Sequence, residues 1–171
     1  AHKIRKVRIY SNRQFADRAD VIWVASCWPN ANPSGYGRGG GARIEMCDDF
    51  QGTSFINNDT DHQEGGYTLG HEWGHYFYGL MDEYRGQTSS PGDLGNPEPT
   101  DVPVQNSIMN TQSEAVGGGN FNWLNFSTPL NNGPGGQNAQ RRVFQASAWE
   151  TLARPPSQDP AGSGEYSTGG S

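Results

Sequence analysis

Two histidines and a glutamate stand together in the segment His71-Glu72-Trp73-Gly74-His75, which has the pattern H-E-x-x-H. On an α-helix, residues four apart lie one turn apart on the same face, so both imidazoles can reach one metal ion. Glu72 lies beside them and has the chemistry of a general base. The chain has only four histidines, and two fall in this pentapeptide. The motif therefore predicts a catalytic zinc site on a helix rather than two unrelated surface histidines.

The helix that carries this motif has an apolar face away from the histidines. Its members recur at helical steps and are Leu69, Trp73, Tyr76, Phe77 and Leu80. We expect this face to pack on a core while the opposite face lines a cleft. Gly65 and Gly66 are expected to precede the helix. Gly79 is its expected stop, because glycine tolerates the left-handed backbone of a C-terminal cap.

The continuation of the motif resembles the signature of two related groups of metallopeptidases. From His71 to Tyr84 the chain reads H-E-x-x-H-x-x-x-G-x-x-D-E-Y. This is similar to the N-terminal protease domain of the calcium-activated chloride channel regulator family, with its prokaryotic relatives, and to the bacterial IgA-peptidase family. The run N-S-I-M-N at residues 106–110 resembles the methionine turn under the zinc of these and other metzincin-like enzymes. The resemblance covers these two stretches and implies a zinc endopeptidase, not a channel.

The third metal ligand is expected to be Asp82. In the usual long motif a glycine follows the second histidine by three residues, and the ligand follows the glycine by three more. Here Gly79 comes four residues after His75, and Asp82 three after Gly79, which indicates one extra helical residue before an unchanged turn. Glu83 is the closer rival; if Asp82 ligates, Glu83 orients the site or packs against the turn. Glu98, a glutamate of the gluzincin kind, stands between two prolines, a poor setting for a helix.

These residues imply hydrolysis of peptide bonds by a zinc-activated water. Zn²⁺ held by the two histidines and Asp82 keeps a fourth position for water, lowers the pKa of that water and polarises the scissile carbonyl. Glu72 takes the water proton and passes it to the leaving amine. Many related enzymes add a tyrosine two residues after the turn methionine, but Thr111 stands there. The group that stabilises the oxyanion is therefore unassigned, with Tyr84 as a candidate.

Two other functions are compatible with a zinc site. One is a recognition or adhesion domain that keeps its zinc but has lost peptidase activity. Glu72 argues against it, because a purely structural zinc site needs no base. The other is a different zinc hydrolase, such as a deaminase or an amidase, but the chain lacks the C-x-x-C of zinc deaminases. We therefore favour the endopeptidase.

The composition indicates one loop-rich globular domain. The chain has 171 residues, and we expect a protease domain at 1–154 followed by a flexible tail or linker at 155–171. Its 24 glycines and 11 prolines indicate many loops, whereas five Trp, seven Tyr and seven Phe are too many for disorder. A net charge of −6 argues against a nucleic-acid partner. No apolar run approaches the roughly 20 residues of a membrane span, and we expect a monomer.

The elements around the helix predict an α+β fold with strands at residues 3–10, 20–27 and 42–47 and a C-terminal helix at 139–152. The resemblance implies a zincin or metzincin-like domain, with a small twisted mixed sheet, the active-site helix and the methionine turn. The continuous apolar run at 20–27 suits a central buried strand. The alternating run from Ala42 to Cys47 suits a half-exposed edge strand. In zinc proteases of this kind such an edge pairs with the extended substrate, so this is the expected peptide-binding strand.

The remaining segments are expected to be turns and loops. Residues 11–20 suit a turn or short helix, and long loops are expected at 28–41, 48–66, 85–101 and 110–138. The aromatic and apolar residues expected to anchor the last loop are Phe121, Trp123, Leu124 and Phe126. The acidic residues of 48–66 could hold a structural Ca²⁺, but their spacing matches no EF-hand loop, so a solvated loop is favoured. We expect His62 at the surface.

Cys27 and Cys47 are the only two cysteines, so only one disulfide can form. They lie at the ends of two predicted strands, a geometry that a bridge could span. The alternative is two buried thiols of a cytosolic protein. The secreted character of the resembled families favours the bridge and an extracytoplasmic or secreted setting.

Overall fold

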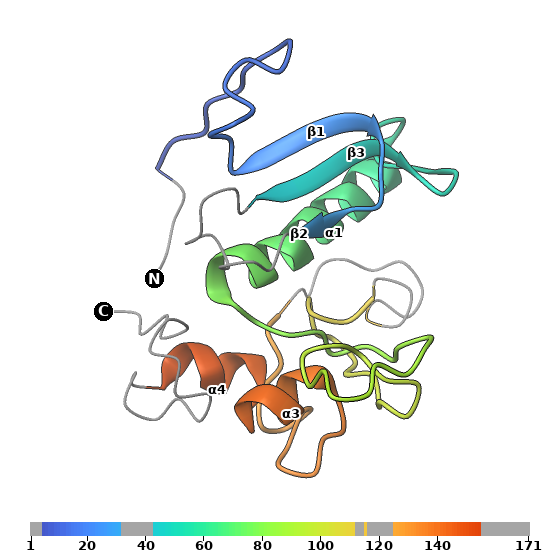
Figure 1. Cartoon of the computed structure of the whole chain (residues 1–171), viewed down its shortest axis with the longest axis vertical. Coiled ribbons are helices and arrows are strands. Elements are labelled where there is room, and N and C mark those ends of the chain that lie inside the picture. Colours follow the sequence, from blue (N-terminus) through green and yellow to red (C-terminus); the bar gives the residue numbers. More distant parts are fainter. Residues whose placement is uncertain (1–4, 32–42, 112–114, 116–124, 155–171) are drawn as a thin grey trace.

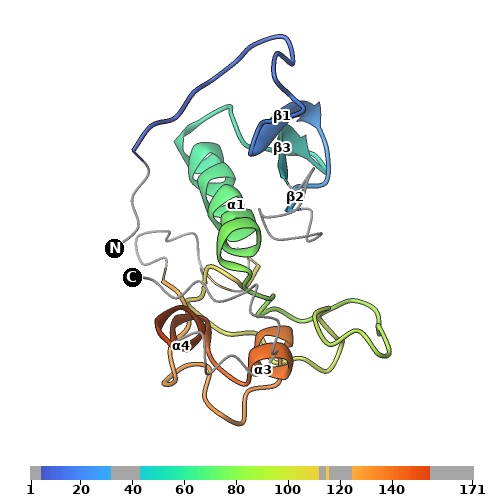
Figure 2. The same cartoon turned by 60° about the vertical axis from the view of Figure 1, so that its left-hand side comes forward.

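A computed structural model of the chain describes residues 5–31, 43–111, 115 and 125–154 (Figure 1). These residues form an α+β fold with a small mixed four-stranded sheet, the long helix α1 (Asp59–Tyr78) and the short helices α3 (Ala139–Phe144) and α4 (Ala148–Ala153). The sheet and α1 make up one half of the molecule, and irregular chain with α3 and α4 makes up the other (Figures 1 and 2). Much of the predicted loop at 28–41, the aromatic residues at 121–124 and the predicted tail at 155–171 lie outside the described residues.

The sheet has the strand order β1-β3-β2, and a short strand β4 also pairs with β3. Strand β1 (Val21–Ser26) runs parallel to β3 (Ile44–Phe50). Strands β2 (Asn30–Ala31) and β4 (Thr53–Ser54) pair with β3 in the antiparallel sense. The mixed sheet is therefore confirmed, with β3 as its central strand.

The predicted places of the two longer strands within the sheet are wrong. Strand β1 lies at an edge, and its Trp23 is 46% exposed with its indole N–H donating to Asp48 at 2.6 Å. Strand β3 is central, because Ile44 and Met46 are fully buried against α1. Since β2 pairs with Ile44 and Glu45 on the side of β3 away from β1, the described part of the predicted peptide-binding segment, residues 43–47, is not the open edge that a substrate would need.

The predicted strand at 3–10 is also not found in its described part. Residues 5–10 lie outside every strand of the structure, and Val7 and Ile9 are 70% and 91% exposed. Basic residues interrupt the apolar alternation here, so neither face of the segment is apolar enough to be held against the core. The turns expected at 11–20 are present.

Helix α1 begins at Asp59, well before the expected start after Gly66. The side chain of Asn58 caps it by accepting the backbone N–H groups of Thr60 and Asp61 at 2.9 and 3.1 Å. Acidic residues in the first turn also favour the positive end of the helix dipole. This cap was the sequence signal for the true helix start.

The glycines within α1 are places where the helix approaches other chain closely. A Cβ on Gly65 would lie 3.0 Å from the Cβ of Phe55, which is buried in the core cluster with Ile44 and Met46. The helix ends where predicted, at Gly79, which has a φ of 65° and donates its N–H to the carbonyl of His75 at 3.1 Å.

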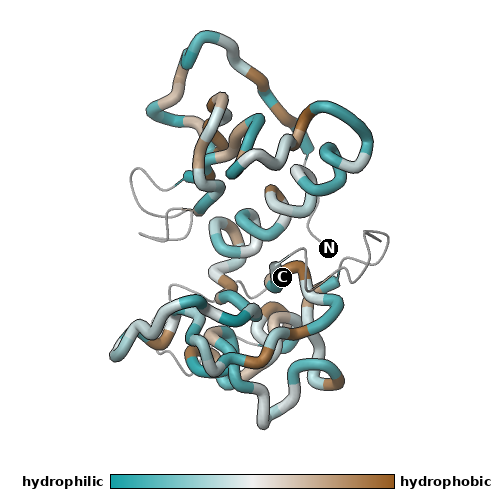
Figure 3. The backbone as a smooth tube through the Cα atoms, turned by 90° about the vertical axis from the view of Figure 1, so that its right-hand side faces the viewer, coloured by the Kyte–Doolittle hydropathy of each residue, from teal (hydrophilic) through white to brown (hydrophobic). Residues whose placement is uncertain are grey.

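The expected apolar face of α1 is confirmed in part. Leu69, Trp73 and Tyr76 pack against the sheet cluster that contains Ile44 and Met46. Phe77 remains 42% exposed, and Leu80, beyond the helix end, belongs to a second cluster with Met109 and Ala148. Short hydrophobic stretches are accordingly spread over both halves of the chain (Figure 3).

The disulfide between Cys27 and Cys47 is present, as predicted, with the two Cα atoms 5.6 Å apart. It ties the chain just after β1 to the central strand β3, across a sequence separation of 20 residues. Closing a loop of that size removes freedom from the unfolded chain and is worth about 3 kcal/mol in the entropic model.

The single C-terminal helix predicted at 139–152 is instead the two helices α3 and α4. Gln145 takes a left-handed conformation with a φ of 53°, which ends α3. Ser147 and Glu150 then form a capping box that starts α4. The S-x-x-E spacing was the signal for this break. In the part of the chain that the structure describes, no helix combines the length and the apolar character that crossing a membrane requires.

Candidate metal centre

Three side chains converge beside the C-terminal end of α1. The Nε2 atoms of His71 and His75 are 3.1 Å apart. The Oδ1 atom of Asp82 lies 3.2 Å from the first of these nitrogens and 3.0 Å from the second. Helix α1 supplies both histidines one turn apart, and the cap at Gly79 turns the chain so that Asp82 returns to them. The predicted triad is thus assembled as a compact triangle of three donor atoms.

The hydrogen bonds of the two Nδ1 atoms, which lie outside the triangle, determine the protonation of the Nε2 atoms within it. The Nδ1 atom of His71 lies 2.9 Å from the carbonyl oxygen of Ile108, and that of His75 lies 2.7 Å from the carbonyl of Leu80. A carbonyl only accepts, so each Nδ1 carries the hydrogen. In a neutral imidazole the Nε2 atom then presents a lone pair. Two lone pairs and a carboxylate oxygen within 3.2 Å of one another repel unless a cation, either a proton or a metal ion, lies among them.

The donor set fits zinc. Two imidazole nitrogens and one carboxylate oxygen are ordinary zinc ligands, with bond lengths of about 2.0–2.2 Å. A catalytic zinc site uses three protein ligands and keeps a further position for water or substrate. The side chains of His71, His75 and Asp82 are 12%, 15% and 13% exposed, so the group is shielded but still reaches solvent. Backbone carbonyls behind both imidazoles fix their orientation, as the partners of metal-ligating histidines commonly do.

The electrostatics of the triad favour positive charge. Burial by itself lowers the pKa of His75, but attraction to Asp82 and the hydrogen bond with it outweigh burial and raise that pKa to about 9. Burial would raise the pKa of Asp82, yet the neighbouring charge of His75 and the hydrogen bonds from both histidines hold it well below its usual range. The carboxylate therefore stays ionised and draws a cation to the triangle.

Glu83 points away from the triad, although it is adjacent to Asp82. Its side chain is fully buried and accepts hydrogen bonds from the hydroxyls of Ser107 and Ser127 and from the amide of Asn132. Burial raises the pKa of Glu83, and these hydrogen bonds oppose the shift. Glu83 therefore makes its side-chain contacts with three segments outside the triad, at Ser107, Ser127 and Asn132.

Glu98 is likewise not part of the triad. Its carboxylate accepts the backbone N–H of Ser90 at 2.7 Å, within the loop that follows α1. His62 is exposed on the first turn of α1, as predicted, with its Nε2 atom 3.1 Å from the carbonyl of Ile56. Among the described residues, the two histidines of the motif and Asp82 are the one group that could hold a metal, so the acidic residues of 48–66 form no second such group there.

The segment predicted as a methionine turn lies directly against the histidine-bearing part of α1. Met109 is fully buried, and its carbonyl accepts the backbone N–H of Glu83 at 2.8 Å. A Cβ on Gly74 would collide with the sulfur of Met109, and a Cβ on Gly70 would lie 2.8 Å from the Cδ1 of Ile108. The two glycines are thus what allows the turn to approach the helix beneath the two imidazoles.

Gly74→Ala is therefore expected to destabilise the protein, whereas Gly66→Ala is not. Both glycines lie in α1, but a Cβ on Gly66 meets nothing within 4 Å. Overpacking a core contact costs about 1–3 kcal/mol, whereas alanine at an open helical position stabilises by up to about 1 kcal/mol. Urea unfolding of the metal-free variants measures both. Equal unfolding free energies would show that Met109 does not pack on the helix in this way.

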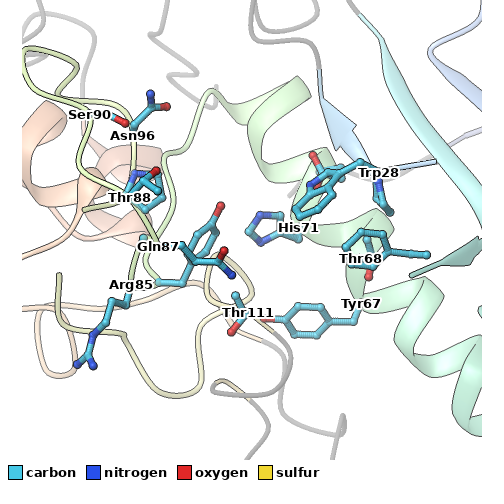
Figure 4. A pocket seen from close by; sticks show the side chains of 16 residues that line it. Trp28, Tyr67, Thr68, His71, Arg85, Gln87, Thr88, Ser90, Asn96 and Thr111 are labelled. Atoms are coloured by element: carbon cyan, nitrogen blue, oxygen red, sulfur yellow. The ribbon is translucent and has the colours of Figure 1, made fainter. Parts of the chain in front are cut away.

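A pocket of about 400 Å³ opens beside the triad and reaches His71, Glu72, Tyr84 and Thr111 (Figure 4). Glu72 is only 8% exposed. Burial raises the pKa of Tyr84, and the nearby carboxylates of Asp82 and Glu72 raise it further, so its hydroxyl stays protonated and hydrogen-bonds to Asp82. A buried carboxylate, a hydroxyl donor and one histidine of the candidate metal group therefore border one cavity.

The far wall of this pocket is anchored by residues that the sequence did not single out. The loop after Tyr84 lines the pocket with polar side chains, including those of Gln87 and Asn96. Arg142, on α3, forms an ion pair with Asp101 and donates to the carbonyl of Asn96 at 2.5 Å. An arginine distant in sequence from the motif thus holds the loop, and no local pattern indicated this contact.

No family model, no curated protein and no solved structure matches the chain. The assignment of a function consequently rests on the arrangement of the site itself.

Proposed function

We propose that this chain is a zinc-dependent endopeptidase. The observation that carries the proposal is the triangle of acceptor atoms from His71, His75 and Asp82, with Glu72 buried beside it and facing the same pocket. A site that only stabilised the fold would have no use for an additional carboxylate in a pocket next to the metal. The resemblance of the motif to the chloride channel regulator protease domain and the IgA-peptidase family points in the same direction.

Zinc bound by these three ligands would acidify a water molecule and polarise a carbonyl group. The work of the protein is to place and move protons around that reaction. Glu72 follows the ligand His71 on α1, and as a general base it takes the proton of the attacking water. Peptide hydrolysis also requires a proton on the leaving amine, and the same carboxylate, now protonated, delivers it.

Tyr84 is the hydrogen-bond donor to the substrate in this proposal. It lines the pocket and keeps its proton, which it donates to Asp82 in the free protein and would redirect to the carbonyl oxygen when a substrate is bound. Donors placed where negative charge develops on a carbonyl oxygen are among the largest contributions to hydrolytic catalysis. Thr111, two residues after Met109, also lines the pocket but has a much shorter side chain.

Two further points complete the proposal. The disulfide between Cys27 and Cys47 supports an extracytoplasmic or secreted setting, because such bonds persist in oxidising compartments. We also propose that residues 1–154 form the catalytic domain. This assignment includes every member of the candidate site, from the pocket residue Trp28 to the loop-anchoring Arg142.

Removal of the metal is the experiment that tests the function. Treatment with a chelator such as 1,10-phenanthroline should abolish cleavage of a denatured protein mixture. One equivalent of Zn²⁺ should restore the cleavage, whereas Mg²⁺ and Ca²⁺, which prefer oxygen ligands, should not. Metal analysis of the purified protein gives the stoichiometry and identity of the ion.

The result also separates the alternatives. Cleavage that survives complete metal removal would contradict the proposal. Stoichiometric zinc without cleavage of any protein would identify the lapsed recognition or adhesion domain instead. Stoichiometric iron would point to a different chemistry, because two histidines and one carboxylate also bind iron in oxygenases.

A further inference from the structure

The end of the pocket next to His71 has an aromatic wall that the hydrolytic mechanism does not use. Trp28, Pro29 and Phe50 line the pocket there, on chain segments that come from the sheet. In Figure 4 Trp28 and Thr68 lie to one side of His71. The polar side chains of the loop after α1, such as Gln87 and Asn96, lie to the opposite side of it. One side of the pocket is therefore apolar and the other side polar.

Trp28 is unusual for a tryptophan because it is 64% exposed. Leaving so large an apolar surface in water forgoes much of the stabilisation that burial of an aromatic side chain typically contributes. Its ring contacts Phe50 edge-to-face, with the ring centroids 4.9 Å apart and the planes at 77°. Phe50 itself packs against the sheet core. The exposed indole thus stands on a fixed aromatic base.

The backbone at Trp28 is held on both sides. Cys27, immediately before it, is bonded to Cys47 of the central strand β3. Pro29, immediately after it, is buried, and Asn30 both donates its side-chain amide to the carbonyl of Trp28 at 2.7 Å and pairs with β3. Little conformational entropy remains to be lost when a ligand contacts a residue held in this way, and such rigid aromatic residues make strong binding anchors.

We propose that Trp28 and Phe50 form a subsite for a large apolar side chain of the substrate, and for an aromatic one above all. This inference rests on the proposed endopeptidase function and names the side chain that the enzyme selects beside the bond it cleaves. An aromatic ring fits here because aromatic pairs gain from offset or edge-to-face contact in addition to the area they bury. The polar loop opposite, with Gln87 and Asn96, faces the more polar remainder of the peptide.

The test uses acetylated, amidated pentapeptides that contain either one phenylalanine among alanines, at each position in turn, or alanine throughout. Cleavage is measured with the wild-type chain, and binding is measured calorimetrically with the Glu72→Gln chain. Each is repeated with Trp28→Ala, Trp28→Phe and Trp23→Ala. Trp23 is the matched control, because it is a partly exposed tryptophan of the same sheet that does not line the pocket.

We expect phenylalanine at one position to improve kcat/KM by at least about tenfold, the usual scale for filling an apolar subsite. Most of this effect should appear in KM, and the same preference should appear in binding. Trp28→Ala should remove the preference, Trp28→Phe should retain part of it, and Trp23→Ala should leave it unchanged. Circular dichroism checks that the variants are folded.

The outcomes distinguish this inference from the proposed function. If the wild type cleaves peptides but Trp28→Ala leaves its preference unchanged, or there is no preference, the subsite is wrong and the peptidase stands. If nothing is cleaved but the phenylalanine peptide binds more tightly and Trp28→Ala removes the difference, the subsite stands and the peptidase is wrong. If the chain shows no cleavage and no selective binding, both the subsite and the peptidase are wrong.

Discussion

Glu72→Gln should abolish peptide hydrolysis while leaving the fold and the metal content unchanged. The amide keeps the size of the carboxylate but cannot accept the water proton, and a positioned general base contributes roughly 10²–10⁴-fold to a rate. In the proposed site the metal is held by the two histidines and Asp82, whose donor atoms are unchanged by the substitution. Initial rates on a denatured protein, together with metal analysis, measure the two quantities separately.

Glu64→Gln provides the matched control. Glu64 also lies on α1, but it does not line the pocket, and its backbone carbonyl accepts the hydroxyl of Thr68 at 2.9 Å. This variant should keep wild-type activity. A Glu72→Gln enzyme that works within a few-fold of the wild type would exclude Glu72 as the base and leave the proposed proton path without its carrier.

The second large effect concerns the two adjacent acidic residues after the helix. Asp82→Ala should weaken metal binding by more than about 100-fold, the upper end of what the loss of an outer partner of a ligand costs. Glu83→Gln should instead act on stability, because it replaces one of the oxygens that accept from Ser107, Ser127 and Asn132 with an amide donor in a buried site. A buried polar group left without its partner costs about 1–3 kcal/mol.

Two quantities are measured for each variant: the zinc affinity, by competition with a chromogenic chelator, and the free energy of unfolding of the metal-free chain in urea. Asp82→Ala should lower the zinc affinity far more than the unfolding free energy. Glu83→Gln should lower the unfolding free energy far more than the zinc affinity. Full zinc occupancy in Asp82→Ala, combined with loss of zinc in a stably folded Glu83→Gln chain, would exchange the roles of the two residues.

Local patterns in the sequence were sufficient for the parts of the site that a single helix and its cap determine. Helical spacing places His71 and His75 together whatever the rest of the chain does, and a left-handed glycine at position 79 returns Asp82 to them. The two cysteines could form only one bridge, and they do so. The likeness of a short motif predicted that Met109 lies under the metal site, and the structure shows its sulfur packed against Gly74 of the histidine-bearing helix.

Features that depend on contacts between segments distant in sequence could not be predicted from local patterns. The continuous apolar run at 20–27 does not reveal that β1 has a partner strand on one side only. The alternating pattern of β3 likewise does not reveal that this strand has partner strands on both sides. The hydrogen bonds of Glu83 come from three segments well separated along the chain. The ion pair of Arg142 with Asp101 similarly joins segments that no periodicity connects.

Because Asp82 and Glu83 point in opposite directions, metal binding at the proposed site would be linked to folding. Asp82 completes the candidate metal triad with side chains of α1, and Glu83 is hydrogen-bonded into the half of the molecule that contains α3 and α4. Disorder in that half would therefore displace Asp82 and lower the affinity for the ion. By the reciprocity of linkage, bound ion stabilises that half against unfolding, by about 2.7 kcal/mol when free ion is at 100 times its Kd. A chelator would then act on this protein as a denaturant as well as an inhibitor.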